Sequence, residues 1–191
     1  MFYLVVFGPP GAGKGTQSDK IIEKYGFAHI STGDVFRANM QEKTELGILA
    51  QDYINKGELV PDALTIDMLI KEVAKFPDAK GVILDGFPRT VPQAEALDQI
   101  LAGENQKVDL VLQLDVTEKE VRDRIEQRAK VSGREDDQKA AIVERRIGEY
   151  FSKTIHVLPY YQQQNKVVSL NGIGDIDQIF DQISSAIDAR I

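Results

Sequence analysis

The chain has 191 residues, a net charge of −7 at pH 7 and no cysteine. This length fits one domain with a sizeable core. The acidic balance argues against a general binder of nucleic acids or membrane surfaces, because both need a basic face. The lack of cysteine excludes disulfides, thiolate metal sites and cysteine nucleophiles. No apolar run approaches the roughly 20 residues that span a bilayer, so we expect a soluble, cytoplasmic protein that binds neither nucleic acids nor membranes.

Strand and helix patterns alternate along the chain. Apolar runs of strand length lie at 2–7, 81–85, 108–116 and 166–170, with a weaker candidate at 27–30. Apolar residues three and four apart predict helices over 14–25, 62–75, 90–102, 117–130, 138–163 and 175–190. Because the strand runs lack polar alternation, they suit a parallel sheet that is buried on both faces. We therefore expect an α/β protein with a three-layer fold around a central parallel sheet of about five strands.

Two stretches interrupt this alternation. Residues 31–60 carry a mainly helical pattern between two strands, and residues 129–137 form a short polar segment between two helices. We expect both to be mobile segments that lie over a site at the strand ends. Plausible helix starts are Ser31, Asp62, Thr90, Thr117 and Asp175.

The segment GPPGAGKGT (8–16) directly follows the first strand and opens the first helix. Four of the 15 glycines lie between Gly8 and Gly15, so the backbone can curl tightly and gather N–H groups at the positive end of a helix. Lys14 can reach the β and γ phosphates of a nucleotide. The usual pattern has Ser or Thr after the lysine, whereas here Gly15 stands there and Thr16 follows. The segment predicts a phosphate-binding loop with an altered contact to magnesium.

The arginines are concentrated in one part of the chain. Six of the nine lie within residues 122–146. A solvated helix face with pairs such as Glu120–Arg124 would explain part of this pattern. Because the same chain carries a phosphate loop, we interpret the cluster as arginines gathered around transferring phosphates. Arg124 and Arg128 are four residues apart and share one helix face.

The chain resembles the adenylate kinase family of nucleoside monophosphate kinases, short-lid form, through segments that follow the family's order. They are the phosphate loop, STGDVFR (31–37), GELVP (57–61), DGFPRTVPQ (85–93), DRIEQR (123–128), GREDDQ (133–138) and ERRIGEY (144–150). DGFPRTVPQ is among the most specific of these signatures. Any one segment alone is weak, but the matches run in the family's order from residue 1 to about 190.

The resemblance implies a role for each matching residue. It assigns to the donor nucleotide the residues Gly11, Ala12, Gly13, Lys14, Gly15, Thr16, Arg124, Arg128 and Gly174. It assigns to the acceptor the residues Thr32, Arg37, Glu58, Leu59, Val60, Gly86, Phe87, Pro88, Arg89, Gln93, Arg134 and Arg145. It assigns to catalysis the residues Lys14, Asp85, Arg89, Arg124, Arg128, Arg134 and Arg145. Asp136 and Asp137 either cap the helix that follows them, help to hold the lid closed, or do both.

The chemistry that the family performs needs few protein groups. An acceptor phosphate has a second pKa of about 6 and is already largely anionic at neutral pH, so no general base is needed. We therefore expect the lone histidines, His29 and His156, to be structural. The resemblance implies Mg²⁺ as cofactor, held mainly through water and phosphates near Thr16 and Asp85 rather than by a protein metal site. It implies no zinc, because the lid is short and has no cysteine.

The resemblance also divides the single kinase domain, 1–191, into a core and two lids. The core would comprise residues 1–30, 61–124 and 138–191. The insertion that binds the monophosphate would comprise 31–60, and the short lid would comprise 125–137. Closure of both lids would exclude water, which competes with the acceptor for the phosphoryl group.

Two positions favour an adenine acceptor within the wider family. Thr32 and Gln93 match adenylate kinases, whereas pyrimidine monophosphate kinases tend to carry alanine and asparagine there. The sequence thus predicts ATP + AMP ⇌ 2 ADP, a reaction of adenine nucleotide homeostasis, with ATP and AMP or ADP as partners and a monomeric enzyme. The alternative is a UMP/CMP kinase of the same family. A remote alternative, a nucleotide-switched binding module, usually needs an N-K-x-D motif, which we do not find.

Overall fold

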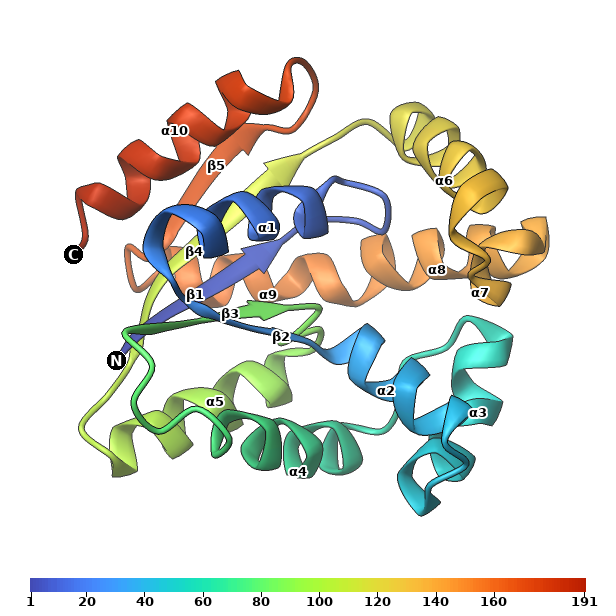
Figure 1. The fold of residues 1–191 in the computed structure, drawn as a ribbon, viewed down its shortest axis with the longest axis horizontal. Coiled ribbons are helices and arrows are strands. Elements are labelled where there is room, and N and C mark those ends of the chain that lie inside the picture. Colours follow the sequence, from blue (N-terminus) through green and yellow to red (C-terminus); the bar gives the residue numbers. More distant parts are fainter.

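The computed structural model describes residues 1–191 and shows a parallel five-stranded sheet between layers of helices (Figure 1). The strands are β1 (Phe2–Phe7), β2 (Ala28–Ser31), β3 (Gly81–Asp85), β4 (Val108–Asp115) and β5 (Val167–Asn171). Their order in the sheet is β2-β3-β1-β4-β5, and all four neighbouring pairs are parallel. The predicted fold class and sheet are confirmed.

The helices connect these strands and cover both faces of the sheet. They are α1 (Lys14–Tyr25), α2 (Thr32–Gln41), α3 (Glu45–Lys56), α4 (Asp62–Val73), α5 (Val91–Gly103), α6 (Glu118–Ser132), α7 (Glu135–Gln138), α8 (Ala140–Ser152), the 3₁₀ helix η1 (Thr154–His156), α9 (Val157–Gln162) and α10 (Ile176–Asp188). Five of the six predicted helices begin and end within two residues of an observed one. None of the helices combines the length and the apolar character that crossing a membrane requires.

The prediction of one continuous helix over 138–163 was wrong. The chain leaves α8 at Ser152, passes through η1 and starts again as α9. Pro159 accounts for the break, because a proline ring clashes with the carbonyl four residues earlier and has no N–H for the helix ladder. In the observed structure Pro159 lies in the first turn of α9, where a missing N–H costs nothing.

The polar segment at 129–137 is also more helical than its sequence suggested. Helix α6 continues to Ser132, and Gly133 ends it with a left-handed φ of 63°. The short helix α7 follows almost at once. Polar composition therefore marked an exposed helix end and a turn, not an extended loop.

Four of the five predicted helix starts act as N-caps. The side-chain oxygens of Ser31, Thr90, Thr117 and Asp175 each accept a hydrogen bond from a backbone N–H in the following turn. The fifth, Asp62, is the first residue of α4 as predicted, but it is not a cap, because Pro61 occupies the N-cap position.

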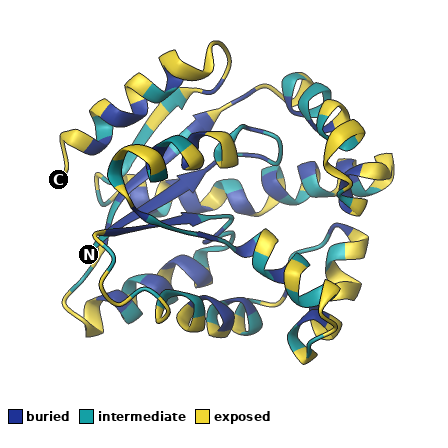
Figure 2. Ribbon diagram, in the orientation of Figure 1, coloured by how far each residue is buried: buried dark blue, intermediate teal, exposed yellow.

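The core consists of two layers separated by the sheet. Alternate residues of β1 point to opposite faces, so Tyr3 and Val5 pack in one cluster and Leu4 and Val6 in the other. Helices α4, α5 and α9 pack on the first cluster, and α1, α6 and α10 on the second. Figure 2 shows the buried strands at the centre and the exposed outer faces of the helices. Burial on both faces explains why these strands are continuous apolar runs.

Residues 31–60 form a small lobe of their own, at the lower right of Figure 1. Helices α2 and α3 pack closely, and a Cβ atom on Gly47 would lie 2.1 Å from the carbonyl oxygen of Asn39. A separate apolar cluster of Phe36, Ala50, Val60 and Met68 joins this lobe to α4. The lobe is therefore packed internally and not held only by its attachment to the sheet.

The strand β3 gives a direct test of the core. Leu84 is fully buried between two other strands and immediately precedes Asp85. We expect Leu84→Ala to lower the free energy of unfolding by about 2–5 kcal/mol, through lost burial and an unfilled cavity. Urea unfolding measures this loss. The matched control is Leu49→Ala on α3, where the leucine is 52% exposed and the change should stay within about 0.5 kcal/mol. Equal losses for the two variants would contradict the packing described here.

Candidate functional site

The loop between β1 and α1 forms one wall of the site. Gly11 and Gly13 have φ values of 80° and 94°, in the left-handed region that favours glycine. A Cβ atom on Gly11 would also lie 3.1 Å from the carbonyl oxygen of Val121. The loop leads into the N-terminus of α1, where the first backbone N–H groups have no partner within the helix. This geometry favours the binding of an anion at the N-terminus of α1.

Lys14 lies across this loop. Its Nζ donates hydrogen bonds to the carbonyl oxygens of Gly8 and Pro9, both at 3.0 Å. Burial lowers the pKa of Lys14 to about 8, and the nearby charge of Asp85 partly opposes this shift. The ammonium group is therefore held inside the site with carbonyl partners only, and a bound phosphate would supply the anionic partner that it lacks.

Asp85 ends β3 beside this lysine. The register of the sheet places Asp85 next to Val6, one residue before the end of β1. Burial alone would raise the pKa of Asp85, but neighbouring His29 and the charge of Lys14 outweigh it, so the pKa lies below its usual range. The Nε2 atom of His29 is 3.9 Å from an Asp85 oxygen and has no hydrogen-bond partner. Asp85 is thus an ionised group at the strand end.

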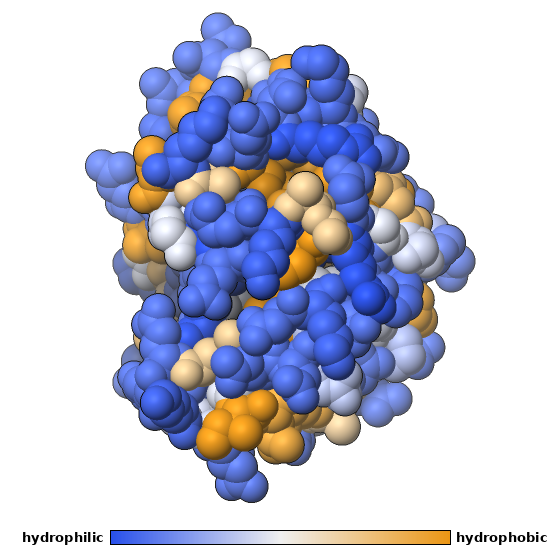
Figure 3. All heavy atoms as spheres, turned by 90° about the vertical axis from the view of Figure 1, so that its right-hand side faces the viewer, coloured by the Kyte–Doolittle hydropathy of each residue, from blue (hydrophilic) through white to orange (hydrophobic).

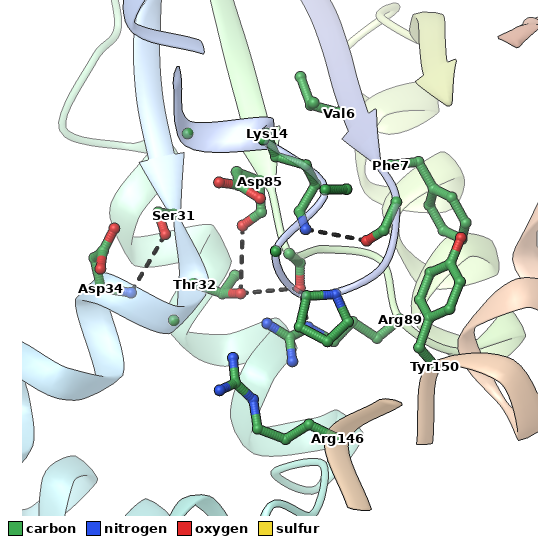
Figure 4. A pocket seen from close by; sticks show the side chains of 18 of the residues that line it. Val6, Phe7, Lys14, Ser31, Thr32, Asp34, Asp85, Arg89, Arg146 and Tyr150 are labelled. Atoms are coloured by element: carbon green, nitrogen blue, oxygen red, sulfur yellow. Dashed lines mark hydrogen bonds between the residues drawn. The ribbon is translucent and has the colours of Figure 1, made fainter. Parts of the chain in front are cut away.

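The turn after β3 forms the opposite wall. The Nε of Arg89 and the hydroxyl of Thr32 donate to the carbonyl oxygen of Gly86, at 2.7 and 2.9 Å. Gly86 has a φ of 78°, and a Cβ there would lie 2.8 Å from both side chains. Figure 4 shows the guanidinium groups of Arg89 and Arg146 close together. Burial, and then the charge of Arg146, lowers the pKa of Arg89 to about 10, so Arg89 stays charged at neutral pH.

Gln93 lies buried in the first turn of α5, four residues after Arg89. Its Oε1 accepts a hydrogen bond from the backbone N–H of Arg89 at 2.7 Å, and its Nε2 donates to Asp62 at 2.8 Å. One N–H of the amide and one lone pair of its oxygen remain free for a ligand.

Carboxylates hold the arginines that project from the lobe and from α6 to α8. Asp34 accepts hydrogen bonds from Arg37 at 2.5 Å and from Arg134 at 3.2 Å, so it joins the 31–60 lobe to the segment after α6. Asp137 accepts bonds from Arg128 at 2.6 Å and from Arg146 at 2.7 Å. The protein therefore provides anionic partners for its own cluster of cations.

Asp137 organises the side of the site formed by α6 and α8. Its side chain is fully buried. Burial alone would raise the pKa of Asp137, but the hydrogen bonds and charges of Arg128 and Arg146 outweigh it and hold the pKa below its usual range. The expected helix cap is not observed, because Lys139 occupies the N-cap of α8 and no side chain caps it. The ion pairs of Asp136 and Asp137 link α7 to α6 and α8 instead.

Most of these groups line one cavity of about 1150 Å³, whereas Asp62 and Asp137 contact lining residues from behind. On the face of the molecule at the right of Figure 1, the surface is largely hydrophilic around a central hollow (Figure 3). Every site residue predicted from the sequence lines this cavity except Arg145. The structure thus brings together the phosphate loop, the turn after β3, residues of the 31–60 lobe and the arginines of α6.

The structure places Arg146, not Arg145, in the cavity. The Arg145 side chain is 52% exposed and binds Glu58 at 2.5 Å, whereas Arg146 is 20% exposed and lines the cavity. The sequence does contain the signal that distinguishes them. Val143 and Tyr150 are buried on one face of α8, and Arg146 is three residues after the first and four before the second. Arg146 therefore shares the inward face, and the motif alone did not reveal this.

The two histidines lie in different places, and the protein side chains do not form a metal site. His29 lines the cavity beside Asp85, whereas His156 is exposed in η1. No group of three or more His, Asp or Glu residues lies close enough to hold a metal ion. Thr16 and Asp85 both line the cavity, so a cation bound to a ligand's phosphates would find a hydroxyl and an ionised carboxylate nearby.

Comparison with known proteins gives one consistent result. Residues 6–166 match the family model described as adenylate kinase. Curated proteins named adenylate kinase are similar over 98% of this chain: one from Bacteroides fragilis at 47% identity and one from Bacteroides thetaiotaomicron at 48%, each covered over 99% of its own length. Another, from Flavobacterium psychrophilum, is 46% identical and is covered over 98% of its length.

The buried carboxylate of Asp137 leads to a prediction for stability. Because its pKa is lowered in the folded state, the ionised form contributes stability above the unfolded value near 3.8, and this contribution is lost as the pH falls. We expect Asp137→Asn to lower the free energy of unfolding by about 1.5–3 kcal/mol at pH 7. Urea unfolding from pH 7 down to about pH 3 should show that the difference in free energy of unfolding between wild type and variant becomes smaller.

The matched control is Asp123→Asn. Asp123 forms an exposed pair with Lys119 at 2.8 Å, and its loss should cost less than about 1 kcal/mol. A gap for Asp137→Asn that stays constant with pH would show that the charge of this carboxylate does not stabilise the fold.

Proposed function

The chain belongs to the adenylate kinase family, and from this membership we propose how its cavity transfers a phosphoryl group reversibly between ATP and AMP to give two ADP molecules. The observation that carries the proposal is that two anion-binding walls face one cavity. Lys14 and the glycine loop form the first wall, and Arg89 with the turn after β3 forms the second.

The donor would lie on the first wall. The N-terminus of α1 and the backbone of residues 11–16 would bind its β and γ phosphates, with Lys14 between them. Arg124 supports this wall directly, because it donates to the carbonyl oxygens of Ala12 and Gly172 at 3.2 and 2.9 Å. Gly174 lines the same end of the cavity and leaves room for the rest of the nucleotide.

The acceptor would lie on the second wall. Arg89 already uses its Nε to hold Gly86, so its outer nitrogens are free to bind the acceptor phosphate as a planar fork. Arg37 would bind the same phosphate from α2. Residues 58–60, Thr32 and Gln93 surround the remaining space, where the base would lie.

The transfer itself would depend on position and charge. The acceptor phosphate is anionic at neutral pH, so no residue needs to remove a proton from it. Arg128, Arg134 and Arg146 would bind the transferring group by exchanging their carboxylate partners for phosphate oxygens. The carboxylates thus keep the cations in place until the substrates bind. We propose that Arg146 has the role that the motif had suggested for Arg145.

The family implies the use of Mg²⁺ together with ATP in general. We propose that the ion would lie among the phosphates, with Thr16 and Asp85 positioned to contact it directly or through water. It would supply the charge that lets two polyanions approach each other. We propose no role for zinc, because the chain has no cysteine.

Two segments would act as lids. We propose the division into the core (1–30, 61–124 and 138–191), the insertion 31–60 and the lid 125–137. The separate packing of the 31–60 lobe supports this division, as does the contact of Asp34 with Arg134 across the two segments. We also propose a monomer that acts in the cytoplasm, which would need no partner to complete the cavity.

The acceptor assay tests the function. With ATP and Mg²⁺, we expect AMP to exceed GMP, UMP and CMP by at least about 100-fold in kcat/KM, because a site built to hydrogen-bond one base rejects others strongly. A coupled assay with the four monophosphates measures this. Comparable rates with UMP or CMP would favour the pyrimidine kinase alternative, and a lack of turnover with every acceptor would favour a binding module.

The two neighbouring arginines of α8 provide a matched pair. We expect Arg146→Ala to lower kcat/KM for AMP by at least about 100-fold, because a preorganised cation near the developing charge is lost. Arg145→Ala should change it by less than about threefold. Thermal unfolding of both variants controls for the loss of the Asp137 ion pair. A larger loss for Arg145→Ala would restore the role that the motif suggested.

A further inference from the structure

The amide of Gln93 is held at both ends by fixed groups. The backbone N–H of Arg89 requires an acceptor, and it receives Oε1 at 2.7 Å. The carboxylate of Asp62 requires a donor, and it receives Nε2 at 2.8 Å. The Gln93 side chain is nearly fully buried, so water cannot replace either partner easily. If the amide turned over, a donor would face a donor and an oxygen would face a carboxylate.

This arrangement fixes what the amide offers to a ligand. After these two bonds, Gln93 keeps one N–H and one oxygen lone pair, and their relative positions cannot be exchanged. A free glutamine amide can rotate to match either order of donor and acceptor. Gln93 can present only one order.

We infer that Asp62 is a positioning residue that selects the acceptor base by fixing the orientation of the Gln93 amide. Asp62 does not line the cavity, so it acts through Gln93 and not by touching the substrate. It comes from the start of α4, 31 residues before Gln93 in the sequence. The inference rests on the proposed function, in which Gln93 faces the base of the acceptor.

The edges of the bases give this orientation a consequence. Adenine and cytosine each present a ring nitrogen that accepts a hydrogen bond beside an amino group that donates one. Guanine and uracil present the reverse, a ring N–H beside a carbonyl oxygen. An amide locked to suit adenine therefore opposes GMP and UMP, whereas it does not by itself oppose CMP. The fixed orientation therefore predicts that kcat/KM for GMP and UMP rises relative to that for AMP when Asp62 no longer holds the amide.

A purely structural role for Asp62 predicts something different. As the first residue of α4, its negative charge also favours the positive end of that helix. That effect depends on charge, whereas the positioning role depends on an oxygen that accepts a hydrogen bond. The variant Asp62→Asn separates the two, because it removes the charge and keeps an oxygen that can accept from Gln93.

The experiment measures kcat/KM of the full-length enzyme for AMP, GMP, UMP and CMP at saturating ATP. We expect Asp62→Ala to raise the GMP/AMP and UMP/AMP ratios by about 3- to 10-fold, the range expected for one neutral hydrogen bond. The CMP/AMP ratio should stay within about twofold, and so should the KM for ATP. Asp62→Asn should keep all ratios close to wild type. Asp62→Leu removes both oxygens while keeping a branched side chain, and it replaces the alanine variant if that variant does not fold.

A double-mutant cycle completes the test. In a Gln93→Ala background, adding Asp62→Ala should leave the base ratios unchanged, because the group through which Asp62 acts is absent. Persistence of the effect in that background would overturn the inference, as would equal effects of Asn and Ala or unchanged ratios in Asp62→Ala. A wild-type enzyme that uses GMP or UMP as well as AMP would instead refute the proposed function.

Discussion

The pairing of β1 with β3 is the constraint on which the rest of the site depends. It sets Val6 beside Asp85, so the glycine loop after β1 and the turn after β3 start from the same edge of the sheet. This pair lies near the middle of the sheet. The strands β2 and β3 lie on one side of β1, and the chain then crosses to add β4 and β5 on the other side. Sites of open α/β proteins form at such points, outside the carboxyl ends of the strands. Lys14 and Arg89 therefore face one cavity although 75 residues separate them in the sequence.

The second constraint is electrostatic. The arginine and lysine side chains that line the cavity would repel one another in the absence of a ligand. Carboxylates offset this repulsion, and they also join separate segments. Asp34 links the 31–60 lobe to the segment after α6, and Asp137 links α6 to α8. In the proposed function, these pairs would hold the arginines in place until phosphate oxygens replace the carboxylates. A chain that is acidic as a whole can thus maintain a strongly basic interior surface.

Much of this could be predicted from the sequence, because the signals were local. Apolar runs predicted the strands, and the glycines and lysine predicted the loop. Capping side chains predicted four of the helix starts. The errors came where the outcome depends on neighbours. The choice between Arg145 and Arg146 depends on which face of α8 is buried, and the break before α9 depends on a proline seven residues after the end of α8 at Ser152. The bond from Gln93 to Asp62 joins two helices, so no local pattern contains it.

The close contact at Gly47 bears on how the 31–60 lobe can move. The carbonyl of Asn39 occupies the place where any side chain at position 47 would begin, so α2 and α3 touch backbone to backbone. Sliding one helix along the other would break this fit, whereas moving both together would preserve it. In the proposed closure, the lobe would therefore move as one rigid body. Natural variation should be far less tolerated at Gly47 than at the outward-facing residues of the same helices, although Gly47 does not line the cavity.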